Sequence, residues 1–168
     1  LLSVLQYELR LMDLMVVAHT PEGVTTELAH VLPSLLVASE RPILITPDEP
    51  VECIGDHIVI AWTSSDEAAC ALRQARGLLA FAKTVEVVII AQDQASAEAE
   101  LVEPLTYLAA HGIHPEQRVL IEKAGNAGAT LLGYCEQSGA DLLVMGAYGH
   151  SRAREFVFGG ATREVLHR

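Results

Sequence analysis

The sequence predicts an α/β fold in which an open parallel sheet carries helices on its faces. Short apolar runs rich in β-branched residues alternate along the chain with longer segments whose apolar residues repeat at helical spacing, a pattern typical of parallel strands joined by crossover helices. The chain has 168 residues, and 51% of them are hydrophobic. One substantial core can therefore be buried, and an intrinsically disordered protein is excluded.

The order of elements follows from changes in this pattern. Ser65 is a good N-cap residue and is followed by the acidic Asp66 and Glu67, so a helix is predicted to begin there. From residue 57 onward we expect strand 57–62, helix 65–83, strand 85–90, helix 96–111, strand 118–122, helix 127–138, strand 141–146, a glycine-containing loop and a helix from about residue 160.

The first fifty residues are predicted to form a separate, smaller unit with a strand at 13–18, a helix at about 25–39 and a strand at 42–46. The segment Asp13-Leu-Met-Val-Val-Ala resembles the segment Asp141-Leu-Leu-Val-Met-Gly. We therefore interpret residues 1–50 as the remnant of one α/β unit and residues 51–168 as most of a second, without its closing strand. On this interpretation the chain is a piece of something longer.

Charge and cysteine content limit the possible functions. The formal net charge is −11, which argues against a protein that binds nucleic acid or an anionic membrane. The longest stretches without charged residues, such as 28–39, are much shorter than the roughly 18 residues of a spanning helix. Cys53, Cys70 and Cys135 form no CxxC pair, so we predict neither a disulfide framework nor a zinc site and expect a reducing, cytoplasmic location.

The stretch most informative about function lies between the last predicted strand and the last predicted helix. It reads Gly146-Ala-Tyr-Gly149-His-Ser-Arg-Ala-Arg-Glu-Phe-Val-Phe-Gly159-Gly160-Ala-Thr162. Glycines let the backbone turn tightly and approach a ligand, and a helix N-terminus favours an anion such as a phosphate. Ligands of α/β sheets bind beyond the carboxyl ends of the strands. The loop is a candidate anion site, although its glycines could also serve only the turn.

The glycine spacing matches the nucleotide loop of the universal stress protein family. The segment GADLLVMGAYGHSRAREFVFGGATREVL resembles the last strand, phosphate loop and last helix of that family. Residues 57–168 resemble one family domain without its closing strand, and residues 11–47 resemble the end of a preceding copy, as in tandem members. The resemblance implies a Rossmann-like fold of the adenine nucleotide alpha hydrolase-like kind and a cytoplasmic stress-response protein.

The resemblance also implies a site for ATP, possible with Mg²⁺. The glycines and Thr162 would surround the phosphates and ribose, Ile90 and Ala91 would lie against the adenine, and Arg152 would face phosphate. The residues implied in nucleotide binding are Thr63, Ile90, Ala91, Gly146, Gly149, His150, Arg152, Gly159, Gly160, Ala161 and Thr162.

Two departures from the family pattern bear on this site. Thr63 stands where family members that bind ATP usually carry an acidic residue, and a hydroxyl lacks the charge-assisted hydrogen bond of a carboxylate. Gly160 stands where Ser or Thr usually follows the third glycine, and Thr162 comes two positions late. A regulatory nucleotide-binding domain and an interaction module with a degenerate site therefore both remain open.

Other chemistry is less well supported. His111 and His114 flank a predicted helix end and are expected to cap it or lie at the surface, not to bind a metal. There is no GxSxG, HExxH or GxxxxGK[ST] motif, so we do not expect an enzyme. A nucleotide-hydrolysing or nucleotide-transferring relative is the weakest alternative.

The expected partner is a second copy of the chain, bound through a sheet edge. In the family the closing strand is an edge strand that often pairs with a partner domain. Ile43, Leu44 and Ile45 form an apolar strand without an obvious neighbour. They are predicted to pair with the sheet formed by residues 57–146, or with the same segment of a second chain.

Overall fold

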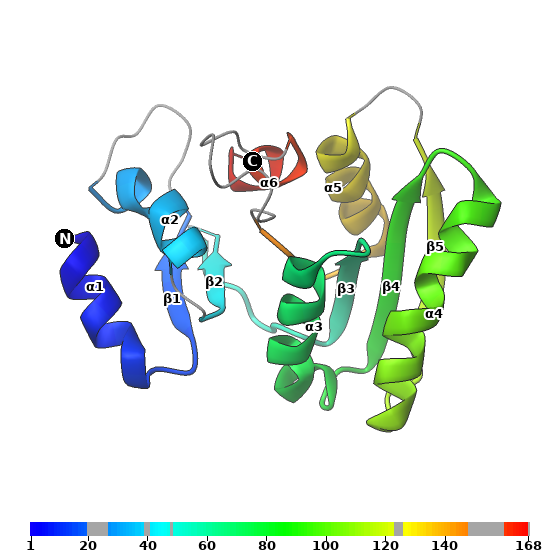
Figure 1. Ribbon diagram of the computed structural model, residues 1–168, viewed down its shortest axis with the longest axis horizontal. Helices are drawn as coiled ribbons and strands as arrows, with labels where there is room; N and C mark the ends of the chain where they lie inside the picture. The colour runs from blue at the N-terminus through cyan, green and yellow to red at the C-terminus, as the bar shows by residue number, and fades with distance from the viewer. Residues whose placement is uncertain (20–26, 39–40, 48, 123–125, 148–159, 168) are drawn as a thin grey trace.

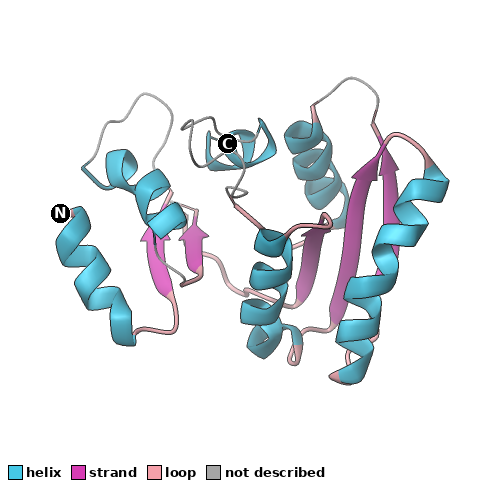
Figure 2. Ribbon diagram, in the orientation of Figure 1, coloured by secondary structure: helices cyan, strands magenta, loops and turns pink. Residues whose placement is uncertain are grey.

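A computed structural model of the chain describes residues 1–19, 27–38, 41–47, 49–122, 126–147 and 160–167. The described strands form two parallel sheets, one of two strands in the order β1-β2 and one of four strands in the order β5-β4-β3-β6 (Figure 1). Helices flank both sheets (Figure 2). The predicted α/β fold with an open parallel sheet is therefore confirmed.

The smaller sheet belongs to the first fifty residues. Its elements are helix α1 (Leu2–Glu8), a short 3₁₀ helix (Leu9–Leu11), strand β1 (Met15–Ala18), helix α2 (Glu27–Ala38) and strand β2 (Ile43–Thr46). In the parallel pair, Met15 lies beside Ile43 and Ala18 beside Thr46. Two strands joined by a crossover helix usually lie next to each other, and β1 and β2 do so.

This pairing corrects one expectation. Ile43, Leu44 and Ile45 do not pair with the larger sheet of the same chain, because β1 occupies one edge of β2 and the larger sheet contains only β3 to β6 among the described strands. The alternative, pairing with the same segment of a second chain, stays a prediction. The predicted division of the chain at residues 50 and 51 also stays a prediction.

The larger sheet and its helices follow the order that the sequence predicts. Their bounds are β3 (His57–Trp62), α3 (Asp66–Leu79), β4 (Thr84–Ala91), α4 (Gln94–Ala110), β5 (Glu116–Ile121), α5 (Ala127–Ser138), β6 (Leu142–Met145) and α6 (Gly160–His167).

Local capping explains several of these bounds. The Ser65 hydroxyl accepts a hydrogen bond from the Ala68 N–H at 3.2 Å, which confirms the predicted start of α3. Helix α4 begins two residues earlier than expected because the Asp93 carboxylate accepts from the Ser96 N–H. Helix α5 ends at Ser138 and is capped by Gly139, whose φ of 72° is the left-handed conformation that glycine adopts without strain. No described helix combines the length and the apolar composition that crossing a membrane requires.

The core of the larger sheet lies on both of its faces. On one face, Trp62 of β3 and Ile89 of β4 pack with Leu72 of α3 and Leu101 of α4. On the other face, strands β3 and β4 pack against α5. After their first residues, His57 and Thr84, the two central strands are apolar with one exception, Glu86, described below.

Candidate functional site

Three neighbouring strands of the larger sheet end at the same edge. Trp62 at the end of β3 lies beside Ile89 of β4, and Ala61 lies beside Met145 at the end of β6. Thr63, the Ile90–Ala91 pair and Gly146 therefore come together at the carboxyl ends of β3, β4 and β6. In the sheet, β4 lies on one side of β3 and β6 on the other, so the strand order changes direction at β3. Such a topological switch point is where α/β sheets usually bind ligands.

The loop after β3 is held by hydrogen bonds of its own side chains. The hydroxyl of Thr63 lies 3.0 Å from the hydroxyl of Ser65, and the Ser65 N–H donates to the Thr63 carbonyl at 2.7 Å. The Ser64 hydroxyl donates to the Glu100 carboxylate at 3.0 Å, and the Trp62 ring N–H donates to the Glu100 carbonyl at 3.1 Å. Thr63 and Ser64 are exposed, so a ligand could share these hydroxyl groups.

Gly146 is held close to the first turn of α3. A Cβ atom at this position would lie 2.6 Å from the Ala68 nitrogen and 2.7 Å from the Glu67 carbonyl carbon. Both neighbours are backbone atoms that cannot move aside cheaply. The requirement for glycine here therefore has a structural reason, the contact between the end of β6 and α3, which the sequence did not reveal.

Ile90 and Ala91 face opposite sides of the sheet. Ile90 packs against the cluster of Val59, Val88 and Leu131 on the α5 side. Ala91 packs against the cluster around Trp62 on the side of α3 and α4. Consecutive residues of a strand alternate in this way, so the two side chains cannot contact the same face of an adenine ring.

The remaining predicted residues lie in or beside the loop between β6 and α6. Gly160 is the first residue of α6 and Ala161 the second, and the Thr162 side chain is buried, with 8% of the residue exposed. The structure thus begins a helix where the sequence predicts the phosphate end of the site. Four predicted residues lie outside the described part of the chain: Gly149, His150, Arg152 and Gly159.

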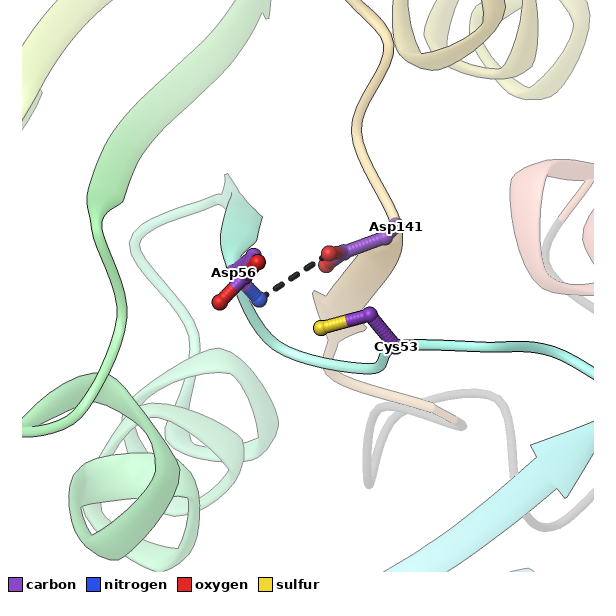
Figure 3. A group of neighbouring side chains, drawn as sticks. All are labelled: Cys53, Asp56 and Asp141. Carbon is purple, nitrogen blue, oxygen red and sulfur yellow. Dashed lines mark hydrogen bonds between the residues drawn. The ribbon is translucent and has the colours of Figure 1, made fainter.

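At the opposite, amino-terminal edge of the sheet, Asp141 organises the loop before β3. Its carboxylate accepts hydrogen bonds from the backbone N–H groups of Gly55 and Asp56, both at 2.9 Å, and of His57 at 3.2 Å. Figure 3 shows Cys53 beside the two aspartates. The ligand atoms of Cys53, Asp56 and Asp141 lie within 4.8 Å of one another.

The chemistry of this group favours a structural role over a metal site. The Lys83 ammonium lies 2.5 Å from the Asp56 carboxylate and lowers the pKa of Asp56. A hydrogen bond with Asp56 raises the pKa of the Cys53 thiol, and a metal ligand must be a thiolate. Since the Asp141 oxygens already accept three N–H bonds, they are committed to the loop.

A second polar group, centred on Glu86, interrupts the apolar core. Glu86 of β4 is only 4% exposed. Its carboxylate lies 2.7 Å from the His57 Nε2 and 3.2 Å from the Arg118 Nε, and it accepts a short hydrogen bond from the Tyr134 hydroxyl. Arg118 also binds Glu116 at 2.7 Å.

The electrostatics of this group follow from burial and hydrogen bonding. Burial alone would raise the pKa of Glu86, but the hydrogen bonds from Tyr134, His57 and Arg118 together outweigh it and hold that pKa below its usual value. Burial, followed by the hydrogen bond to Glu86, raises the pKa of Tyr134 to about 12. Burial raises the pKa of the Cys135 thiol to about 11, so this cysteine is protonated and unreactive at neutral pH.

Sequence reasoning missed both polar groups, although each left a signal. Glu86 is the one charged residue in the apolar run 85–91. Asp141 directly precedes strand β6, and Asp13 holds the corresponding place in the echoing segment. The reasoning was right about His111, which is the C-cap residue of α4; its Nδ1 lies 2.8 Å from the Tyr107 carbonyl.

Comparisons with known proteins agree with this architecture. The family model described as "Universal stress protein family" matches residues 80–168. Over 44 residues, 26% of this chain, the sequence is 46% identical to a universal stress protein of Synechocystis sp.. The chain covers 15% of the length of that protein.

One solved structure is similar in fold over nearly the whole chain. A universal stress protein from Archaeoglobus fulgidus superposes with a TM-score of 0.79 at 16% identity, over 99% of this chain and 63% of that one. A protein from the universal stress protein family of Burkholderia pseudomallei, 22% identical, gives a TM-score of 0.49 over 70% of this chain and 95% of that one.

Proposed function

Because the chain belongs to the universal stress protein family, we propose that this stress-response protein acts in the cytoplasm and binds an adenine nucleotide, ATP with Mg²⁺, as a regulatory ligand. The nucleotide is held and released without efficient turnover. The glycine loop contains no lysine that could polarise phosphates, which supports a binding role over a catalytic one.

The observation that carries the proposal is the convergence of three strand ends at the switch point. Thr63 follows β3, Ala91 ends β4 and Gly146 follows β6. The N-terminus of α6, at Gly160, lies at the far end of the loop that begins beyond Gly146. Exposed hydroxyls, main-chain N–H groups and a helix N-terminus are the groups that bind ribose and phosphate.

The local charge supports binding of the magnesium complex over the free nucleotide. Asp66 and Glu67 occupy the first turn of α3, whose backbone contacts Gly146. Their negative charge opposes bare phosphates at this edge. A bound Mg²⁺ offsets part of the phosphate charge, and Arg152 is the residue of the loop that we expect to contact phosphate.

An interaction module with a degenerate site is the second candidate, and two observations favour it. Gly146 has a packing reason to be glycine, and the hydroxyl of Thr63 already has a partner in Ser65. Neither residue therefore requires a ligand to explain it. In this case the protein acts through association with a second copy at a sheet edge, which we also propose for the nucleotide-binding form.

Calorimetric titration of the chain with ATP, in the presence and absence of Mg²⁺, tests the first candidate. We expect saturable binding that needs Mg²⁺ and is lost in Gly149→Val, because a branched side chain blocks the approach of the backbone. Phosphate release, measured over hours on the same samples, should stay at the level of protein-free controls. Absence of binding heat, together with a melting temperature that ATP does not change, would support the interaction module instead.

A further inference from the structure

Glu100 of α4 is held beside the end of β3 by two contacts. The ring N–H of Trp62, the last residue of β3, donates to the main-chain carbonyl of Glu100 at 3.1 Å, and Trp62 is only 2% exposed. The Ser64 hydroxyl donates to the Glu100 carboxylate at 3.0 Å. One contact holds the backbone of the helix and the other holds the side chain. The carboxylate is therefore kept at the strand ends, although Ser64 and Glu100 are 36 residues apart in sequence.

This restraint distinguishes Glu100 from a glutamate that only covers the surface of its own helix. Long exposed side chains sample several rotamers, and holding one of them costs conformational entropy. Glu98, two residues earlier, accepts a hydrogen bond at 2.9 Å from Gln94 of the same helix. Glu100 is bonded instead to the loop after β3, which belongs to the proposed nucleotide site. The strand ends thus set the orientation of its carboxylate.

The Glu100 carboxylate keeps acceptor positions for a ligand. An ionised carboxylate has about four lone-pair positions, and the Ser64 hydroxyl uses one of them. Glu100 is exposed, as are Ser64 and Thr63. Since an ionised carboxylate can only accept hydrogen bonds, it attracts the donors of a ligand and repels its anionic groups. In a nucleotide, the neutral donors are the hydroxyls of the sugar and the amino group of the base.

The strand order places this carboxylate away from the expected phosphate end of the ligand. Strands β4 and β6 lie on opposite sides of β3. Helix α4, which carries Glu100, packs on β4 and β5, whereas α6 follows β6 in the chain. A nucleotide whose phosphates lie near the N-terminus of α6 would keep that charge away from Glu100. Its sugar would lie nearer to Glu100, at the end of β3.

We propose that Glu100 binds the ribose hydroxyls of the nucleotide and selects ligands with an unmodified ribose, an inference that rests on the proposed nucleotide-binding function. Two neighbouring hydroxyls can donate to the two oxygens of one carboxylate, and the charge strengthens both hydrogen bonds. Carboxylates bind ribose in this way in other nucleotide-binding α/β sheets. Ser64 is a positioning residue, because its hydroxyl orients the carboxylate. A phosphate on the ribose would meet this negative charge and be rejected.

Calorimetric titrations with ATP and with 2′,3′-dideoxyATP, both in the presence of Mg²⁺, test the proposal. We expect the wild type to bind ATP about tenfold more tightly, because only ATP has the two donors. Glu100→Gln should reduce this ratio to about threefold or less, and Ser64→Ala should reduce it in part. Glu103→Gln makes the same change in charge at an exposed position one turn along α4 and should keep the ratio. Repulsion between Glu100 and the phosphates affects both nucleotides equally, so it cancels in the ratio.

The outcomes separate this inference from the proposed function. If the wild type binds neither nucleotide, both are overturned. If it binds the two nucleotides equally, or if Glu100→Gln keeps the wild-type ratio, nucleotide binding stands and the role of Glu100 is overturned. Titration with inosine triphosphate, which lacks the amino group of adenine, tests contact with the base. A preference for ATP over inosine triphosphate that falls in Glu100→Gln, with an unchanged dideoxy ratio, would assign the carboxylate to the base and also overturn the inference. Circular dichroism verifies that each variant folds.

Discussion

The carboxylate of Asp141 accepts a hydrogen bond from the backbone N–H of Asp56 at 2.9 Å, although 85 residues separate the two in sequence. The same carboxylate accepts from Gly55 and His57, so one side chain satisfies two N–H groups of the loop before β3 and the first N–H group of the strand. This contact fixes the position of β3 relative to β6 along the strand direction. It therefore also fixes how the carboxyl ends of the two strands are aligned at the proposed nucleotide site.

Asp141→Ala should therefore destabilise the chain. Removing a charged acceptor from its hydrogen bonds costs about 2 kcal/mol. We therefore expect the free energy of unfolding, measured by urea titration, to decrease by about that amount. Asp13→Ala is the matched control, because Asp13 holds the corresponding position in the echoing segment and is exposed. A decrease as large in Asp13→Ala would contradict the structural role of Asp141.

The contact of Gly146 with α3 predicts that a larger residue at this position destabilises the chain. Gly146→Ala places a Cβ against two backbone atoms of α3, so we expect a loss of about 1–3 kcal/mol in the free energy of unfolding. Gly77→Ala, in the interior of α3, meets no atom within 4 Å and should stabilise the chain by up to about 1 kcal/mol. A pair of thermal melts compares them. The prediction fails if both substitutions shift the melting temperature upward.

The buried carboxylate of Glu86 makes stability depend on pH. Because the pKa of Glu86 in the folded chain lies below the ordinary value of 4.5, its ionised form stabilises the fold at neutral pH. This contribution is present above the ordinary value and is lost as the pH falls through the folded one. Glu86→Gln should cost about 2 kcal/mol at pH 7, and the variant should lose less stability than the wild type between pH 5 and pH 3.

Urea unfolding at several pH values measures this difference. Tyr134→Phe is the control, because it removes one donor while His57 and Arg118 still hold the carboxylate ionised. We expect that variant to lose about 1 kcal/mol and to keep most of the acid dependence. Parallel pH profiles for the wild type and Glu86→Gln would show that Glu86 is not the group responsible.

The position of Thr63 allows a test of ligand chemistry. Thr63→Asp should tighten the binding of the ATP–magnesium complex by about 1 kcal/mol, because a carboxylate forms charge-assisted hydrogen bonds that a hydroxyl cannot. Thr106→Asp, on the exposed surface of α4, makes the same change in net charge and should have no effect. Calorimetric titration of the wild type and the two variants with ATP and Mg²⁺ measures the difference in affinity. Equal or weaker binding by Thr63→Asp would argue that the hydroxyl is not where the ligand binds.

Two proline substitutions separate pairing within the chain from pairing between chains. In β2, Leu44 directs its N–H toward β1, whereas Ile45 directs its N–H to the outer edge, as the bonds to Pro42 and Thr46 show. Leu44→Pro should lower the melting temperature of the chain. Ile45→Pro should leave the pair β1-β2 largely intact but abolish a dimer formed through the outer edge of β2. Sedimentation equilibrium on both variants measures this. A dimer that survives Ile45→Pro would exclude that edge.

Much of the fold could be predicted because it depends on local patterns. The apolar run of β3 and the Ser65 cap of α3 determine their elements with little help from the rest of the chain. The family resemblance rested on glycine spacing, which is also local. The pairing of β2 was predicted wrongly within the chain because the strand was assigned to the larger sheet, although the predicted strand at 13–18 was available to pair with it.

The packing reasons for individual residues could not be predicted, because they depend on segments far apart in sequence. Gly146 appeared to serve a ligand, yet its closest neighbours are backbone atoms of Glu67 and Ala68. The donors to Glu86 come from β3, β5 and α5, and no spacing rule connects them.

The three donors around Glu86 also restrict how the strands can align. If β4 slipped by one residue, Glu86 would turn to the opposite face of the sheet, near Ile58 and Ile60, where it would lie buried without a donor. An uninterrupted apolar strand would tolerate several alignments at similar energy, whereas β4 satisfies its one charge in a single alignment. The buried glutamate thus acts against misfolded sheets, excluding neighbouring registers that the apolar residues of β4 alone would permit.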